Sequence, residues 1–323
     1  MTDSSAAGGR PRWTMDALHS HLQSAVDLEI WTIPYYLTAM YSIKDPSHDA
    51  YQLIQSVVYE EMLHAQLASN IANAYGYVPT FQAPTYVGKR VPHLCFRLDE
   101  PNPTQIYHPH SAELGPLDAP RINTMCLIEY PEWDTERTPD LRPQVEEYGS
   151  IGELYAALRA GMTELRDELR GGVRQVDMFS GFFNEFEQQT VTYDGTEGLR
   201  QAMVLVDVIT DQGEGQTEGD ADIPEAFRNT ADGIEPSWPH FRKFTAIRDA
   251  GSFPETYQGV VDPPDGSPGQ AAQQRLMADF ATFLQVLDTL FSGGQTGDFG
   301  SLMAKIGGDV LTCWQHGAVP KFS

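Results

Sequence analysis

The hydrophobic positions between residues 14 and 76 predict two long antiparallel helices with polar side chains in their shared core. In the first helix, apolar residues recur every three or four positions, and Glu29 falls within that series. In the second, the same spacing continues through Glu61 and His64, which are three residues apart and share a helix face. The apolar positions are Leu18, Leu22, Ala25, Val26, Ile33, Tyr36, Leu37 and Met40, then Ala50, Ile54, Val57, Ala68, Ile71 and Tyr75. All three polar side chains are therefore predicted to point inward.

The turn between the helices places these side chains at one level. Residues 44–46 form a turn sequence, and Ser47 is the predicted N-cap of the second helix. Glu29 precedes Ile43, the end of the first helix, by fourteen residues, and Glu61 follows Ser47 by fourteen. Because buried carboxylates are costly unless paired or bound to a cation, this convergence predicts a metal site. A Glu from one helix with Glu-x-x-His from its neighbour is half of a di-metal site in a four-helix bundle.

The sequence of these two helices resembles a known family. The matching runs are residues 28–43, residues 60–64 with the sequence Glu-Glu-Met-Leu-His, and residues 70–74. On these runs the chain resembles the ferritin-like domain of the iminophenylpyruvate dimer synthase family, whose enzymes oxidatively couple aryl-pyruvate imines in violacein and indolocarbazole biosynthesis. The resemblance implies a mainly helical, ferritin-like four-helix bundle with long loop insertions and additional C-terminal helices.

The chain beyond the first two helices predicts a long insertion. Residues 77–149 are rich in proline and aromatic residues, and we expect loops and short strands that form a lid over the metal site or an interface. Within them, Glu129 and Glu132 are similar to a run of the family. The segment has no helical period that would aim both inward, so we expect these two residues to hold loop structure.

Helices three and four are predicted within residues 150–250. In helix three, Glu153 lies in an Ile-Gly-Glu-Leu-Tyr run that resembles that of the family, yet Ser150-x-x-Glu153 is also a capping box. Metal ligand and helix cap are equal alternatives for this glutamate. Helix four runs into Asp-Gln-Gly-Glu-Gly at residues 211–215, which resembles an acidic signature of the family.

An acidic insert at residues 216–239 separates Glu214 from His240. We predict that the insert loops out and that these two residues replace a second Glu-x-x-His pair. A His240 that only starts a helix is the alternative. Antiparallel packing of helices three and four would bring Glu153 near Asp211, Glu214 and His240.

The predicted ligands are carboxylates and imidazoles without cysteine, which suits iron or manganese with open coordination positions. They are Glu29, Glu61, His64, Glu153, Glu214 and His240, with Asp211 and Glu129 left open. Bundles with such ligands are typical of di-iron centres that use O2 or peroxide, so we predict a di-iron oxidoreductase of secondary metabolism, with Mn as the other metal. By the resemblance, its substrate is an aromatic amino-acid-derived imine or a related small molecule. Its pocket residues, for which plain packing is the alternative, are Trp31, Tyr35, Tyr36 and Phe241.

The composition mainly excludes partners. With 21 basic and 45 acidic residues, the net charge of −24 argues against nucleic acid or an anionic membrane surface as a partner. The three cysteines are too scattered for a zinc knuckle or a disulfide framework. No stretch has the pattern of a signal peptide or a membrane span. We therefore expect a cytoplasmic protein that acts on a small molecule.

The 323 residues are predicted to form one elaborated domain, with a disordered lead at 1–13 and C-terminal helices at 270–314. Those last helices are expected to add a layer to the bundle or to mediate homo-oligomerisation. Three alternatives to an oxidoreductase remain: a partner subunit of a biosynthetic enzyme, an iron-storage protein, and a metal-free bundle whose Glu/His cluster is a hydrogen-bond network. Storage is disfavoured because the long insertions would obstruct the assembly of a cage.

Overall fold

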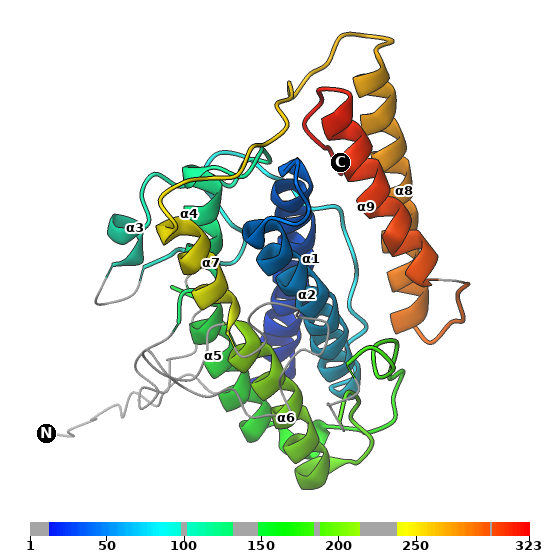
Figure 1. Ribbon diagram of the computed structural model, residues 1–323. Coiled ribbons are helices and arrows are strands. Elements are labelled where there is room, and N and C mark those ends of the chain that lie inside the picture. Colours follow the sequence, from blue (N-terminus) through cyan, green and yellow to red (C-terminus); the bar gives the residue numbers. More distant parts are fainter. Residues whose placement is uncertain (1–12, 98–101, 132–147, 184–187, 214–237, 298) are drawn as a thin grey trace, which may run out of the picture.

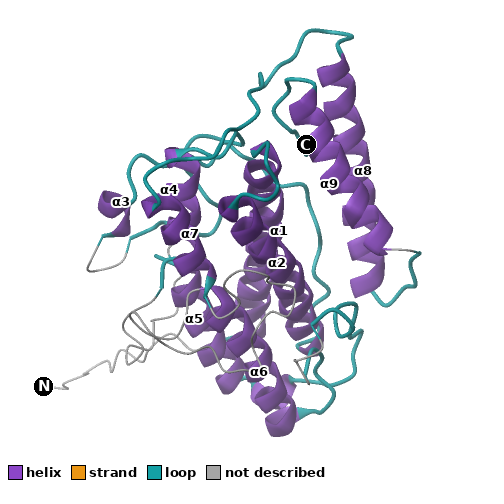
Figure 2. Ribbon diagram, viewed as in Figure 1, coloured by secondary structure: helices purple, strands orange, loops and turns teal. Residues whose placement is uncertain are grey.

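The computed structural model is mainly helical, as the hydrophobic pattern predicts. It describes residues 13–97, 102–131, 148–183, 188–213, 238–297 and 299–323. Those ranges contain no strand (Figure 2). Their α-helices are α1 (Met15–Ser42), α2 (Asp49–Ala74), α3 (Pro103–Ile106), α4 (Ala119–Ile128), α5 (Ile151–Glu164), α6 (Gly195–Gly213), α7 (His240–Asp249), α8 (Pro268–Phe291) and α9 (Phe299–Gln315). The predicted lead, apart from Trp13, and residues 216–237 of the predicted insert lie outside the described ranges.

Helices α1 and α2 are the antiparallel pair predicted from the sequence. Thr14 caps α1, because its side chain accepts a hydrogen bond from a backbone N–H of the first turn. The N-cap of α2 is His48, whose ring nitrogen accepts from the Ala50 N–H at 3.1 Å, and not the predicted Ser47. Just beyond α2, Gly76 has a φ of +75°, a conformation that glycine adopts without strain.

The other two positions of the bundle are each shared by two shorter helices. α5 packs against α1 and α6, α4 packs against α7, and both α6 and α7 pack against α2. Figure 1 shows α4 above α5 and α7 above α6, so each pair fills one position along the long helices. Helix α6 is described as far as Gly213, and α7 begins at His240 after two non-helical residues, 238 and 239. As a result, helix ends lie halfway along the bundle.

Helix α4 corrects the prediction of loops and short strands for residues 77–149. Asp118 caps this helix, and Pro120 lies in its first turn, where a missing N–H does no harm. All seven residues from Ile122 to Ile128 are buried, so the run has no polar face that would reveal a helical period. Because α4 packs against α7, this part of the predicted insertion belongs to the bundle.

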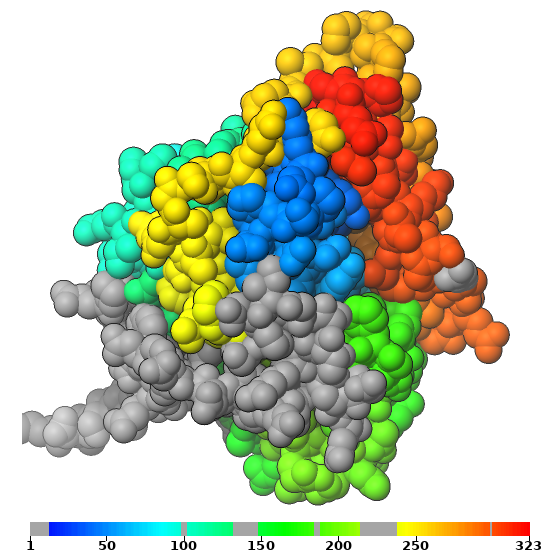
Figure 3. Space-filling model, viewed as in Figure 1, coloured from blue at the N-terminus to red at the C-terminus, as the bar shows by residue number. Residues whose placement is uncertain are grey.

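Helices α8 and α9 form a hairpin beside α1 and α2 (Figures 1 and 3). The hairpin is anchored by Trp314, whose indole N–H donates to the carbonyl of Thr38 at 3.0 Å. α9 contacts α1 and α8 contacts α2, which makes the hairpin an added layer on the bundle. None of the helices in the described ranges is both long enough and apolar enough to span a membrane.

Candidate metal centre

Five ionisable side chains from α1, α2, α4 and α7 meet in the middle of the bundle. They are Glu29 on α1, Glu61 and His64 on α2, Glu129 at the C-cap of α4, and His240, the first residue of α7. All five are between 0% and 2% exposed. Buried ionisable groups are rare unless they are paired or bind a cation, so their meeting requires an explanation.

The atoms that face one another are spaced like donors around a cation. His240 Nδ1 lies 2.9 Å from Glu61 Oε1 and 3.6 Å from Glu129 Oε2. His64 Nδ1 lies 3.8 Å from Glu29 Oε2 and 3.9 Å from Glu61 Oε1. The three longer distances exceed those of hydrogen bonds. Two atoms that each bind one cation at about 2.1 Å commonly lie about 3–4 Å apart.

Two of these buried atoms have no hydrogen-bond partner. They are Glu29 Oε2 and His240 Nδ1, the latter close to Glu61 but outside hydrogen-bond geometry. Buried polar atoms in folded proteins are almost always paired. One orphaned atom from each side of the cluster, both aimed at its centre, fits residues arranged to hold a cation.

Outer partners fix which nitrogen of each histidine faces the cluster. His64 Nε2 lies 2.9 Å from Gln212 Oε1, and His240 Nε2 lies 3.0 Å from Glu60 Oε2. The amide of Gln212 is itself oriented, because its NH2 group donates to Glu60 Oε1 at 3.2 Å. Since both outer oxygens are acceptors, the neutral form of each histidine carries its proton on Nε2. Their Nδ1 lone pairs are then free for a metal, as in metal sites with outer carboxylates.

Each of the three carboxylates is held in the same way, by one hydroxyl on one oxygen. The donors are Tyr155 to Glu29 Oε1, Thr32 to Glu61 Oε2 and Tyr36 to Glu129 Oε1, all at 2.6 Å. In every case the other oxygen is the one that faces the histidines. Such bonds orient ligands before a metal arrives.

The electrostatics favour a cation. Burial raises the pKa of Glu29 well above its ordinary value, and repulsion by Glu61 and Glu129 adds to this. Burial, with the positive charge of His240 nearby, lowers the pKa of His64 to about 4, so His64 is neutral and able to ligate. Burial alone would lower the pKa of His240, but Glu129, Glu60 and Glu61 together raise it well above 6.5. Without a metal, the carboxylates thus draw a proton onto this histidine.

A buried lysine balances the outer carboxylate. Lys243 Nζ lies 3.1 Å from Glu60 Oε2 and 3.0 Å from the Ser56 hydroxyl. Burial raises the pKa of Glu60, but Lys243, His240 and His64 together outweigh burial and hold the pKa below its ordinary value. Glu60 therefore stays ionised and available to the His240 imidazole.

The structure brings together four of the six predicted ligands, Glu29, Glu61, His64 and His240. Glu153 does not join them: its Oε2 accepts from the Gly149 N–H at 2.6 Å, and its N–H donates to the Ser150 hydroxyl at 3.1 Å. These bonds make Glu153 part of the helix cap, the alternative that the sequence allows, although its carboxylate accepts from Gly149 and not from the N-cap Ser150. Because Glu153 and Tyr155 are two residues apart on α5, they point in nearly opposite directions, and Tyr155 is the one that faces Glu29.

The side chains that α4 and α6 contribute to the cluster differ from the prediction. The sequence predicts that Glu129 holds loop structure. In the structure it is the C-cap of α4 and part of the cluster. Asp211 is buried in the last turn of α6, but it is the next residue, Gln212, that contacts His64. Glu214 and Glu132 lie outside the described residues.

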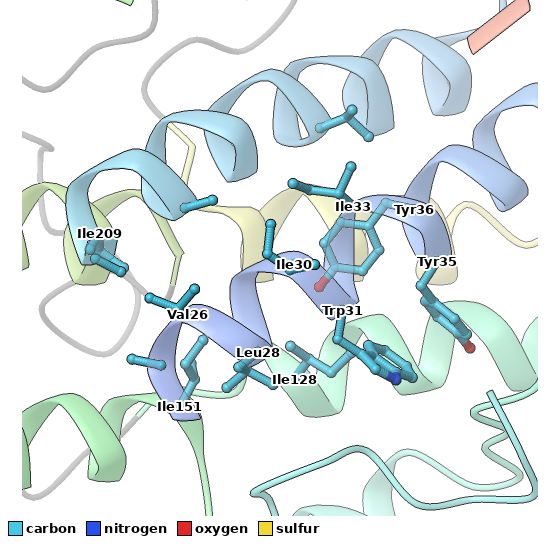
Figure 4. Close-up of a cluster of buried hydrophobic side chains, with 14 of the residues drawn as sticks. Val26, Leu28, Ile30, Trp31, Ile33, Tyr35, Tyr36, Ile128, Ile151 and Ile209 are labelled. Atoms are coloured by element: carbon cyan, nitrogen blue, oxygen red, sulfur yellow. The ribbon is translucent and has the colours of Figure 1, made fainter. Parts of the chain in front are cut away.

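The four aromatic residues predicted for a pocket have different places. Tyr36 lies at the cluster and donates to Glu129. Trp31 and Tyr35 stack on each other with ring centroids 4.8 Å apart, and Figure 4 shows them on the side of α1 where Ile128 lies, away from α2. Phe241 is partly buried against other aromatic rings, those of Tyr107 and Tyr130.

Several residues of the site were not predicted. Those that contact a ligand are Glu60, Thr32, Tyr155 and Gln212. Tyr155 lies within an apolar stripe, where its ring conceals the hydroxyl. Glu60 precedes Glu61 directly, and an acidic pair at a core position was the one signal in the sequence that could have identified it.

The fold and these side chains define a class: a four-helix-bundle protein with carboxylates and histidines in its core. The chain belongs to the Ferritin-like family, whose family model matches residues 22–249. Among solved structures, the chain is similar to a ferritin like protein from Caulobacter vibrioides, determined at 1.95 Å resolution. The two are 56% identical with a TM-score of 0.85, over 97% of this chain and 100% of that chain. No protein with a curated description matches this sequence.

The comparisons confirm the predicted ferritin-like fold. The narrower resemblance, to the iminophenylpyruvate dimer synthases, stays a prediction.

Proposed function

We propose that this protein is a metal-dependent oxidoreductase whose core holds a pair of iron ions, with manganese as the alternative. One observation carries the proposal: three buried carboxylates each turn one oxygen toward a histidine Nδ1 atom, and two of the facing atoms, Glu29 Oε2 and His240 Nδ1, have no hydrogen-bond partner. Oxygen and imidazole ligands without cysteine suit iron and manganese. The ligands would be Glu29, Glu61, His64, Glu129 and His240, and Glu214 remains a further candidate.

Iron bound there would supply oxidation by O2 or peroxide. The chain supplies position and protection. Glu61 lies between the two histidines, so it would hold the metal together with both of them. Gln212 and Glu60 hold the histidine tautomers, and three hydroxyls hold the carboxylates. Because all the ligand side chains are almost completely buried, bulk water is kept away from the reacting atoms.

The resemblance of residues 28–43 and 60–64 to iminophenylpyruvate dimer synthases supports a substrate class. We propose an imine derived from an aromatic amino acid, or a related small molecule of secondary metabolism. Purified, iron-loaded protein would be incubated with such imines and O2, and coupled products would be identified by mass spectrometry.

Metal analysis tests the centre itself. Freshly purified protein should contain about two iron or manganese ions per chain, as a di-metal carboxylate bundle does. The variants Glu61→Ala and His64→Ala should lose the metal and keep their helical circular dichroism, because α1 and α2 bury enough apolar surface to fold without it. Full metal occupancy in both variants would refute the assignment.

A further inference from the structure

Four aromatic rings connect the candidate centre to the protein surface. Tyr36 donates its phenol O–H to Glu129 Oε1 at 2.6 Å, and its ring centroid lies 6.2 Å from that of Tyr35. Tyr35 stacks on Trp31 at 4.8 Å, and Trp31 lies 4.8 Å from Tyr86. Figure 4 shows the first three of these side chains on neighbouring turns of α1. We call these four residues the aromatic chain.

The outer end of the aromatic chain is Tyr86. The three inner rings are fully buried, whereas Tyr86 is partly exposed and its neighbour Val87 is 74% exposed. The Tyr86 hydroxyl donates to the carbonyl of Trp31 at 2.8 Å, which fixes its ring against the indole. The aromatic chain therefore begins at a proposed ligand and ends where solutes can reach it.

We propose that the aromatic chain carries single electrons from the surface to the metal centre when the oxidised centre has no substrate to oxidise. The inference rests on the proposed function, because the oxidant is the metal centre after reaction with peroxide or O2. Phenol and indole rings are the side chains that lose an electron most readily, apart from those with sulfur. Rings in or near van der Waals contact exchange electrons over short distances.

Each step balances. One electron leaves the Tyr36 ring for the oxidised centre, and the phenol proton moves along the 2.6 Å hydrogen bond to Glu129 Oε1. An electron from Trp31, passed across the stacked Tyr35 ring, restores Tyr36, and the proton returns to it from Glu129. Tyr86 then gives an electron to Trp31, and its proton leaves the hydrogen bond to the Trp31 carbonyl and passes to solvent at the exposed part of this residue. A one-electron reductant in solution, such as a thiol, finally reduces Tyr86, which regains a proton from water.

The site contains a second tyrosine that serves as a matched control. Tyr155 donates to Glu29 Oε1 at the same 2.6 Å, and its hydroxyl is equally buried. Among the described rings, none stacks on Tyr155. A Tyr155→Phe variant therefore removes the same kind of hydrogen bond to a proposed ligand but leaves the aromatic chain intact.

The experiment traps radicals on the full-length protein. Protein loaded with Fe²⁺ without oxygen receives a pulse of hydrogen peroxide, without organic substrate, in the presence of a nitrosoalkane spin trap. Peptide mass spectrometry then maps the adducts, and the metal content of each sample is measured. Wild type should carry the adduct on Tyr86, and metal-free protein treated identically should not.

Two variants decide the outcome. Trp31→Phe should lose the Tyr86 adduct at unchanged metal content, Tyr36→Phe should lose it at whatever metal content that variant retains, and Tyr155→Phe should keep it in proportion to its bound metal. Trp31→Phe changes no hydrogen bond at the centre, so it tests the chain even where Tyr36→Phe weakens metal binding. An adduct on Tyr86 in both variants, or none in metal-loaded wild type, would overturn the inference and leave the metal centre standing. Protein that binds no metal at all would instead refute the proposed function.

Discussion

Replacing Glu29 by glutamine should stabilise the metal-free protein. Glu29 is fully buried, burial and the charges of Glu61 and Glu129 raise its pKa, and its Oε2 has no hydrogen-bond partner. A buried charged atom without a partner costs about 1–3 kcal/mol or more, because the charge loses its hydration. Glutamine keeps the size of the side chain and the oxygen that accepts from Tyr155, and it removes the carboxylate charge. We therefore expect the free energy of unfolding of the metal-free variant to rise by about 1–3 kcal/mol.

With metal present, the stability advantage of the variant should shrink by most of the increment that the metal gives to wild type. A cation at about 100 times its dissociation constant adds about 2.7 kcal/mol to a protein that binds it only when folded. The Glu29→Gln variant lacks a charged ligand and should lose most of that increment. The assay is urea unfolding at pH 7 followed by helical circular dichroism, once with EDTA and once with excess Mn²⁺, which avoids oxidation during the measurement.

The same substitution at Glu153 is the control. This glutamate is also buried, but its carboxylate accepts from the Gly149 N–H at the start of α5. Glutamine keeps an oxygen that can accept from this N–H, so Glu153→Gln should change the free energy of unfolding little, and equally with and without Mn²⁺. A Glu29→Gln variant that is less stable than wild type without metal, or that keeps the full Mn²⁺ increment, would contradict the assignment of Glu29 as a ligand.

Three further predictions test other parts of the structure. Gln212→Leu removes the acceptor of His64 Nε2 and should lower metal affinity about 10- to 100-fold in a competition titration; unchanged affinity would deny this outer bond a role. Burial lowers the pKa of His21 below 6.5, so the unfolded chain takes up the proton first as pH falls. The free energy of unfolding should therefore decrease as the pH falls below 6.5, and it should decrease less steeply in His21→Phe. An equal pH dependence in the two proteins would contradict this role of His21. Gly198→Ala would place a Cβ 1.9 Å from the Tyr193 carbonyl oxygen and should lower the free energy of unfolding by about 1–3 kcal/mol. An unchanged melting curve would show that the backbone relaxes.

The first half of the site could be predicted because α1 and α2 are regular. Their apolar series has a helical period, and Glu29, Glu61 and His64 occupy positions of that series. The short turn then fixes the register, and the observed distance of 3.8 Å between His64 Nδ1 and Glu29 Oε2 agrees with the predicted common level. Period and turn length are both local properties, which a single sequence records.

The second half could be predicted only in part. The sequence predicts a loop at Glu129, because α4 is buried on every side and its residues show no helical period. Glu153 looked like a ligand by resemblance, but the direction of a side chain on α5 depends on how that helix packs. The outer bonds of Gln212 and Glu60 join residues more than 140 positions apart in sequence. No local pattern carries that information, because it arises from tertiary packing.

Helix ends explain how the two halves fit together. Glu61 and His64 are spaced by one continuous helix, whereas Glu129 ends α4 and His240 starts α7, so no helix sets the distance between them. The long pair of helices sets it instead, since Tyr36 on α1 holds Glu129 and Glu60 on α2 holds His240. The contact of α4 with α7 adds to this. The regular α1–α2 pair therefore serves as the template for the whole centre, and its outer hydrogen bonds should matter as much to metal binding as the ligands at the helix ends.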